Sequence, residues 1–174
     1  SEEMNSGAMA GNLQQSVSNL KLLRDLSNWS PETFHAEAFL TTAVPLFNNM
    51  LRTLVDPTSF ANNRDIVAKY KFEKEFVLSD LLTIYSNLNF RDVLVNEILR
   101  DERYYRKEYF STALQKAANE NCTDETVLEK FEALILQLSN AKKEEEEDET
   151  IFGEIPDQYL CSIIGTVIHV LFSS

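Results

Sequence analysis

The 174-residue sequence has few of the residues that interrupt regular structure, with four glycines and four prolines. Strand-rich folds need many tight turns, which these two residue types usually supply. Leucine, alanine, glutamate and lysine are plentiful instead, and apolar residues recur every three or four positions. The sequence therefore predicts an all-α fold, either a helical bundle or an armadillo-like array of helix pairs. An acidic linker and a short apolar tail follow it.

Reactive side chains are also scarce. His35 and His169 are the only histidines and lie far apart, in no motif of a metal site or a Ser/His/Asp triad. The two cysteines, Cys122 and Cys161, form no CxxC pair, and we interpret both as free thiols in a reducing compartment. A glycine-rich phosphate loop is missing as well. These absences argue against a self-contained active site, a metal or a cofactor, and favour a binding or scaffold domain.

The chain is strongly acidic, with a net charge of -12 and a pI near 4.6. This balance argues against nucleic acid and against an anionic membrane surface as partners. Residues 144–149 are six consecutive acids, so they carry half of the net charge. Such a run repels itself, and we interpret residues 141–154 as a solvated acidic linker. Binding of a basic partner is the alternative.

Residues 11–140 have the apolar periodicity of a helical core domain, whereas residues 1–10 lack it and are expected to be a disordered lead-in. Ser30-Pro31 predicts a helix start, and Pro45 either kinks that helix or begins another. Residues 57–75 are expected to be a connector anchored by Phe60, Ile66, Tyr70 and Phe72. The helices expected are 12–29, 31–55, 76–87, 89–99, 104–118 and 127–138. The apolar side of the first is expected to comprise Val17, Leu20, Leu22, Leu23 and Leu26.

Residues 155–174, IPDQYLCSIIGTVIHVLFSS, are mostly apolar although they follow the acidic run. The apolar part from Tyr159 to Phe172 has fourteen residues, against the ~20 that span a bilayer. A tail anchor, a segment of the core and the start of a further domain are the three possibilities. A tail anchor would make this chain a tail-anchored cytosolic domain, whereas a segment of the core would make it a free-standing helical adaptor.

Three stretches favour the third possibility. The first begins with YKF at residues 70–72 and continues through the helix expected at 76–87. The second, DERYYRKEYFSTA, covers residues 101–113, and the third is IPDQYL at 155–160. Their order and spacing resemble the ubiquitin conjugation factor E-four family of U-box ubiquitin-chain elongation factors, over residues 40–164. The family-motif core positions are Tyr70, Phe72, Leu81, Ile84, Tyr85, Asp101, Arg103, Tyr105 and Phe110.

The third stretch resembles the start of the family's U-box, at the positions Ile155, Pro156, Asp157, Tyr159 and Leu160. Cys161 and Ser162 replace the family's Asp-Pro. By resemblance, Ile163 then occupies the position that contacts the ubiquitin-conjugating enzyme. A U-box needs about 70 residues to fold without a metal, so residues 155–174 are expected to be an incomplete U-box start.

The resemblance implies a fragment of a ubiquitin ligase of the U-box type, acting in ubiquitin-dependent degradation. Its implied partners are a ubiquitin-conjugating enzyme, a polyubiquitinated substrate and an AAA-type ATPase segregase. It further implies a monomer in the cytoplasm and nucleus, without a membrane or nucleic-acid partner. In this family the U-box positions the thioester of the conjugating enzyme, so no residue is assigned a catalytic role. The fragment is expected to be inactive alone.

A basic and aromatic cluster lies at residues 103–107, RYYRK. Its structural interpretation is a helix start whose aromatic side packs while its basic side is solvated. Its functional interpretation is a docking patch, for the rest of the elongation factor's helical core. The sequence favours the structural interpretation.

Overall fold

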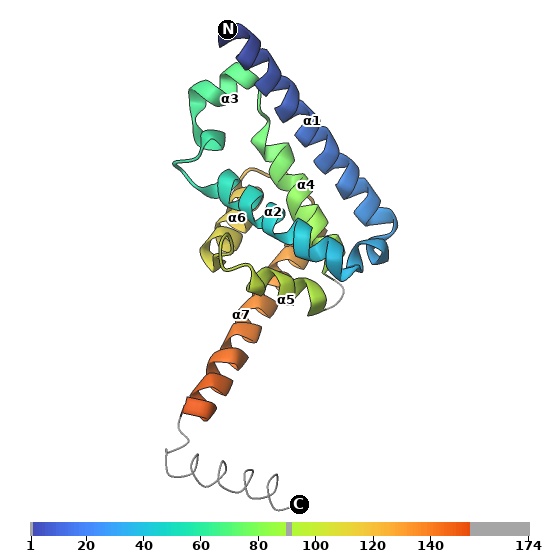
Figure 1. Ribbon diagram of the computed structural model, residues 1–174, viewed down its shortest axis with the longest axis vertical. Coiled ribbons are helices and arrows are strands. Elements are labelled where there is room, and N and C mark those ends of the chain that lie inside the picture. The colour runs from blue at the N-terminus through green and yellow to red at the C-terminus, as the bar shows by residue number, and fades with distance from the viewer. Residues whose placement is uncertain (1, 90–91, 154–174) are drawn as a thin grey trace, which may run out of the picture. The chain divides into compact units, whose positions relative to one another are not determined.

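A computed structural model describes the backbone of residues 2–89 and 92–153, and side chains at 11–34, 36, 38–89 and 92–141. Every regular element in the described ranges is a helix, which confirms the predicted all-α class (Figure 1). The armadillo-like pairing stays a prediction. The elements are α1 (Glu2–Trp29), the 3-10 helix η1 (Pro31–His35), α2 (Glu37–Val55), the 3-10 helix η2 (Phe60–Asn62), α3 (Arg64–Tyr70), α4 (Lys74–Leu88), α5 (Asp92–Arg100), α6 (Lys107–Asn119) and α7 (Glu125–Gly153).

Two helices extend beyond their predicted limits. Helix α1 begins at Glu2, within the expected lead-in, and α7 continues through the acidic run to Gly153, where a linker was expected. Both extensions are rich in alanine, methionine, glutamate or lysine, which have high intrinsic helix propensity. The chain divides after Leu138 into two compact units, Ser1–Leu138 and Ser139–Ser174. The packed core described below belongs to the first.

Helix α1 packs along α4 (Figure 1) and is joined to it by polar contacts. The guanidinium of Arg24 donates to the buried carboxylate of Asp80 and, at 2.7 Å, to Asp25. The hydrogen bonds to Asp25 and Asp80 raise the pKa of Arg24. About one turn further along α1, Ser27 Oγ accepts a hydrogen bond from Asn87 of α4 at 2.9 Å. These contacts fix which side of α1 faces the core.

The apolar side predicted for α1 is partly wrong. Leu20 is buried, but Leu22 is 58% exposed, Leu26 is 39% exposed and Trp29 is 84% exposed. At about 100° per residue, these three lie on the side of the helix opposite Leu20. The helix therefore has apolar residues on two sides, and α4 covers one of them.

Helix α2 runs through Pro45 without ending, while Ser30-Pro31 begins η1 and not the long helix. The carboxyl end of α2 is closed by Lys116 of α6, whose ammonium donates to the carbonyls of Leu54 and Val55 at 3.3 and 3.4 Å. Burial lowers the pKa of Lys116, and the charge of Lys74 lowers it further. A cation at this end of a helix also complements the helix dipole.

Four aromatic rings from four helices meet in the core. The ring of Tyr85 on α4 lies 5.4 Å from Phe110 of α6, 5.8 Å from Phe131 of α7 and 6.0 Å from Phe47 of α2, between centroids. Phe110 and Phe131 stack at 5.7 Å. All four are buried. Rings at these separations attract one another beyond the burial of their area.

A buried hydrogen-bond chain begins at the same tyrosine. The Tyr85 hydroxyl donates to Asn48 Oδ1 of α2 at 2.6 Å, and Asn48 Nδ2 donates to Asp101 Oδ2 at 2.9 Å. The other carboxylate oxygen of Asp101 accepts from the backbone N–H of Tyr104 at 3.3 Å. Burial raises the pKa of Tyr85 well above its usual value, and the charge of Asp101 adds to this. The chain ties α2 and α4 to the turn between α5 and α6.

We predict that Tyr85→Phe lowers the free energy of unfolding by about 1–3 kcal/mol, because it leaves the buried Asn48 oxygen without its donor. Urea unfolding followed by circular dichroism measures the change. The control is Tyr105→Phe at a half-buried ring, expected to cost less than about 0.5 kcal/mol. Equal losses in the two variants would contradict the assignment of the buried hydrogen bond.

We predict that Leu81→Ala costs about 2–5 kcal/mol, because this side chain of α4 is fully buried and its removal leaves a cavity. The same unfolding experiment measures the loss. Leu136→Ala is a matched control at a side chain that is 62% exposed, with an expected loss below about 0.5 kcal/mol. A loss of that small size for Leu81→Ala would mean that α4 presents a different face to the core.

Candidate functional site

The family-motif positions lie in two places. Tyr85, Asp101 and Phe110 are buried, and the half-buried Tyr105 ring lies 5.4 Å from Phe110. Leu81 and Ile84 are buried on the same helix as Tyr85. The structure thus brings the buried positions of two of the three motif stretches into one core cluster, whereas Arg103 of the second stretch is exposed. Tyr70 and Phe72 lie apart from it, at the connection between α3 and α4.

The predicted U-box start, Ile155, Pro156, Asp157, Tyr159 and Leu160, lies outside the described residues, as does Ile163. Their roles stay predictions. Among the described residues, Cys122 is a free, half-buried thiol whose pKa is raised by burial. In that part of the chain, no three His, Cys, Asp or Glu side chains are grouped to hold a metal ion, and no helix combines the length and apolarity that crossing a membrane requires.

The basic and aromatic cluster at residues 103–107 makes contacts within its own turn and with α2. The Arg103 and Arg52 guanidinium carbons lie 4.9 and 5.7 Å from the centroid of the Tyr104 ring, at cation–π separations. Arg106 donates to two carbonyls of the α5–α6 turn, at 3.0 and 2.7 Å. These contacts favour the structural interpretation of the cluster over a docking patch.

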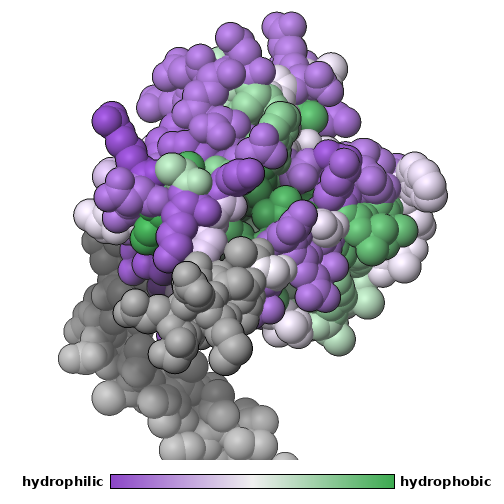
Figure 2. All heavy atoms as spheres, turned by 90° about the horizontal axis from the view of Figure 1, so that it is seen from above, coloured by the Kyte–Doolittle hydropathy of each residue, from purple (hydrophilic) through white to green (hydrophobic). Residues whose placement is uncertain are grey.

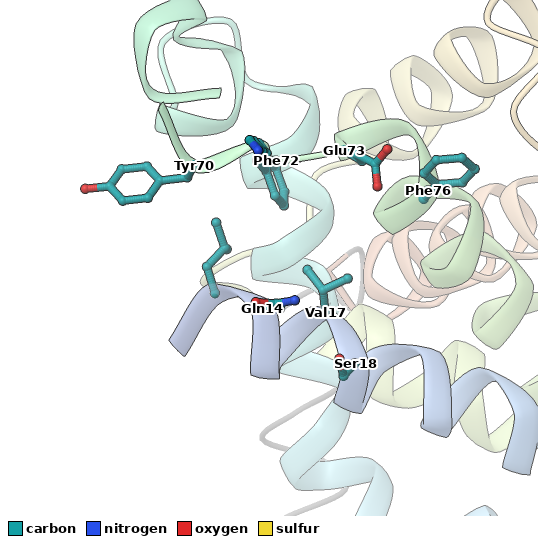
Figure 3. Close-up of a pocket in the computed structure, with 9 residues that line it drawn as sticks. Gln14, Val17, Ser18, Tyr70, Phe72, Glu73 and Phe76 are labelled. Atoms are coloured by element: carbon teal, nitrogen blue, oxygen red, sulfur yellow. The ribbon is translucent and has the colours of Figure 1, made fainter. Parts of the chain in front are cut away.

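An open groove lies instead between α1 and the connection from α3 to α4 (Figure 3). Two cavities, of about 380 and 340 Å³, share the side chains of Leu13, Val17 and Phe72. We call this the Phe72 groove and define it by the residues Leu13, Val17, Tyr70, Lys71, Phe72 and Phe76. On the face seen in Figure 2, the surface is largely hydrophilic, with apolar side chains reaching it in places.

Local sequence explains how the groove forms. Asn63 caps α3, its side-chain oxygen accepting from the N–H groups of Asp65 at 3.0 Å and Ile66 at 3.2 Å. The helix ends at Tyr70, and the capping residue after it, Lys71, has left-handed backbone angles, φ 49° and ψ 44°. The N–H of Phe72 then bonds back to the carbonyl of Val67 at 3.0 Å, closing a Schellman-type end. This turn sends the Phe72 ring toward α1 (Figure 3).

The sequence predicted Phe72 as an anchor but did not predict the groove beside it. Phe60, also expected as an anchor, is 50% exposed, with its ring centroid 6.3 Å from that of Phe72. Phe76 at the start of α4 is 61% exposed, while Val77 beside it is buried. A connector needs few aromatic side chains to anchor it. The larger number of aromatic residues between 60 and 76 was therefore the signal in the sequence that could have predicted the groove. Chemically, the groove offers apolar side chains together with the exposed Lys71 and Glu73 and the polar Gln14 and Ser18.

Comparisons with known proteins identify the first unit. Residues 3–139 match the family model described as the ubiquitin elongating factor core. The chain is 26% identical over 157 residues to ubiquitin conjugation factor E4 ufd-2 of Caenorhabditis elegans, covering 90% of this chain and 16% of that protein. It is 22% identical over 149 residues to E4 ubiquitin-protein ligase UFD2 of Saccharomyces cerevisiae, covering 85% and 16%.

Ubiquitin conjugation factor E4 of Schizosaccharomyces pombe is a third relative, at 23% identity over 146 residues, covering 84% of this chain and 14% of the relative. The chain therefore spans about one sixth of the length of these relatives. The family match covers most of the described helices and includes the buried motif positions. This chain belongs to the ubiquitin elongating factor core family.

Proposed function

We propose that this chain is the C-terminal part of the core of a ubiquitin-chain elongation factor, and that it acts as a scaffold for the partners of ubiquitin transfer. The observation that carries the proposal is the family match over residues 3–139. The buried positions of Tyr85, Asp101 and Phe110 support a structural role for the motif residues. A scaffold contributes by positioning the reacting molecules, and it needs no nucleophile of its own.

The partners proposed are a ubiquitin-conjugating enzyme, a polyubiquitinated substrate and an AAA-type ATPase segregase, in ubiquitin-dependent degradation in the cytoplasm and nucleus. The chain is proposed to act as a monomer. The helical core 11–140 would hold the scaffold, residues 141–154 would separate it from the next segment, and residues 155–174 would begin the U-box. Ile163 would contact the conjugating enzyme only within a complete U-box.

We predict that this polypeptide alone elongates no ubiquitin chains with ubiquitin, activating enzyme and a panel of conjugating enzymes. A U-box must complete its groove before it can bind a conjugating enzyme, and about twenty residues are too few to fold as such a domain. Immunoblotting for polyubiquitin measures the outcome. Polyubiquitin that depends on this chain and disappears on Ile163→Ala would contradict the expected inactivity of this polypeptide alone.

The scaffold role is tested in the same assay by exchange. The matched stretch of the budding yeast E4 ubiquitin-protein ligase is replaced by residues 3–139 of this chain, and folding is checked by circular dichroism and thermal melting. The folded hybrid is expected to retain chain elongation. With the added change Leu81→Ala, the hybrid is expected to lose thermal stability before it loses chain elongation. A hybrid that folds normally and elongates no chains would count against the scaffold role.

A further inference from the structure

Helix α1 lies along α4 but buries few of its own apolar side chains (Figure 1). Among its described side chains, at residues 11–29, Leu20 and Ser27 are the buried ones. Helix α4 buries seven apolar side chains, which are Val77, Leu78, Leu81, Leu82, Ile84, Tyr85 and Leu88. A helix in a protein is held mainly by the packing of its apolar face, so α1 is held less firmly than α4.

The part of α1 before Leu20 lies beside open space. Leu13 and Val17 line both cavities of the Phe72 groove, and Leu20 lines the second, of about 340 Å³. The other walls of the second cavity come from α2, η2 and α4, where Leu54 and Val77 are buried. Side chains that line a cavity of this size make fewer packing contacts than those of a close-packed core.

The sequence of this part of α1 adds little to its stability. Residues 11–19, GNLQQSVSN, contain one glycine, two asparagines and two serines, which have lower helix propensity than alanine or leucine. Segments with few buried apolar contacts open locally while the rest of a protein stays folded. Helix α1 meets this condition.

Polar contacts near the carboxyl end of α1 join it to α4 instead. Arg24 donates to the buried carboxylate of Asp80. Asn87 donates to Ser27 Oγ at 2.9 Å and to Asn28 Oδ1 at 2.7 Å. While α1 is docked, Asp80 depends on Arg24, because a buried carboxylate without a partner is strongly disfavoured. When α1 is away from α4, water hydrates that carboxylate, so the ion pair favours the docked form.

The connection to α2 gives α1 a hinge. The helix ends at Trp29, Ser30 has non-helical backbone angles of φ -149° and ψ 69°, and η1 then packs against α2 and α4. On the side of α1 opposite Leu20, the side chains of Leu22, Leu26 and Trp29 are exposed. Among the described elements, none therefore covers the helix on that side.

We propose that α1 is a strap that opens and closes on the rest of the first unit, with the ion pair of Arg24 and Asp80 as its latch. Opening uncovers an apolar face of α2 and α4 that includes Leu54 and Val77, which are buried while the strap is closed. The proposal stands on the packing of α1, so it holds or fails separately from the role in ubiquitin-chain elongation.

Native-state hydrogen exchange on the intact 174-residue chain, measured by mass spectrometry, tests the strap. After correction for intrinsic rates, amides in residues 20–29 are expected to exchange about tenfold or more faster than those in residues 77–88, yet more slowly than in an unfolded chain. Arg24→Gln is expected to speed exchange in residues 20–29 by about tenfold or more, because the closed form then holds the Asp80 carboxylate unpaired.

A core variant separates opening of the strap from unfolding of the whole unit. Phe131 lies in the four-ring core, which stays intact in both the open and the closed form. Phe131→Leu is therefore expected to speed exchange in residues 77–88 by about tenfold or more and to change it in residues 20–29 by less than about twofold.

Two further variants isolate the latch. Lys21→Gln removes an exposed cation from the same helix and should leave exchange in residues 20–29 unchanged. In the Arg24→Gln chain, the added change Asp80→Asn should restore much of the lost protection, because the buried group is then uncharged. An effect of Arg24→Gln on helix propensity alone would give no such rescue. Thermal melting confirms that each variant is folded.

Several outcomes would overturn the proposal. Equal protection of residues 20–29 and 77–88, or equal acceleration of both by Phe131→Leu, would mean that α1 opens only when the whole unit unfolds. Unprotected amides in residues 20–29 of the original chain would mean that α1 is not docked. Exchange that is indifferent to Arg24→Gln, equally sensitive to Lys21→Gln, or not rescued by Asp80→Asn would rule out the ion pair as the latch.

Discussion

The side chain of Tyr85 is the one on which the core most depends. Its ring joins α2, α6 and α7 through Phe47, Phe110 and Phe131, and its hydroxyl begins the hydrogen-bond chain through Asn48 to Asp101. Such a site accepts few alternatives, because a smaller residue leaves a cavity and a residue without the hydroxyl leaves a buried polar atom unpaired. The arrangement of four helices is therefore specified largely at one residue.

This core has consequences for function. A domain that positions partners must keep its surfaces in a fixed geometry, and the interlocked rings of the core supply that rigidity. The Phe72 groove lies at a different part of the same unit, where a cap on α3 and a left-handed residue at its end hold an aromatic ring against α1. For the proposed scaffold, the core would maintain the shape, while the groove leaves apolar side chains at the surface.

Much of the core could be predicted from the sequence. A helix with one stripe of apolar and aromatic residues can turn only that side toward the core. Leu81, Ile84 and Tyr85 repeat at helical spacing and are buried together. The faces of α1 could not be predicted, since apolar residues occupy two of its sides and the contact between Arg24 and Asp80 selects one. The long helical ends and the groove also escaped prediction, because they depend on backbone propensity and on a turn that lysine rarely adopts.

The claim that the motif residues act as one unit is tested most directly by a double-mutant cycle between Tyr85→Phe and Asp101→Asn, which are linked through Asn48. Urea unfolding of both single variants and the double variant gives the coupling free energy. The account predicts a coupling of about 0.5–3 kcal/mol, because both changes disturb the same buried chain of hydrogen bonds. Losses that add to within about 0.3 kcal/mol would contradict it, since independent sites behave in that way.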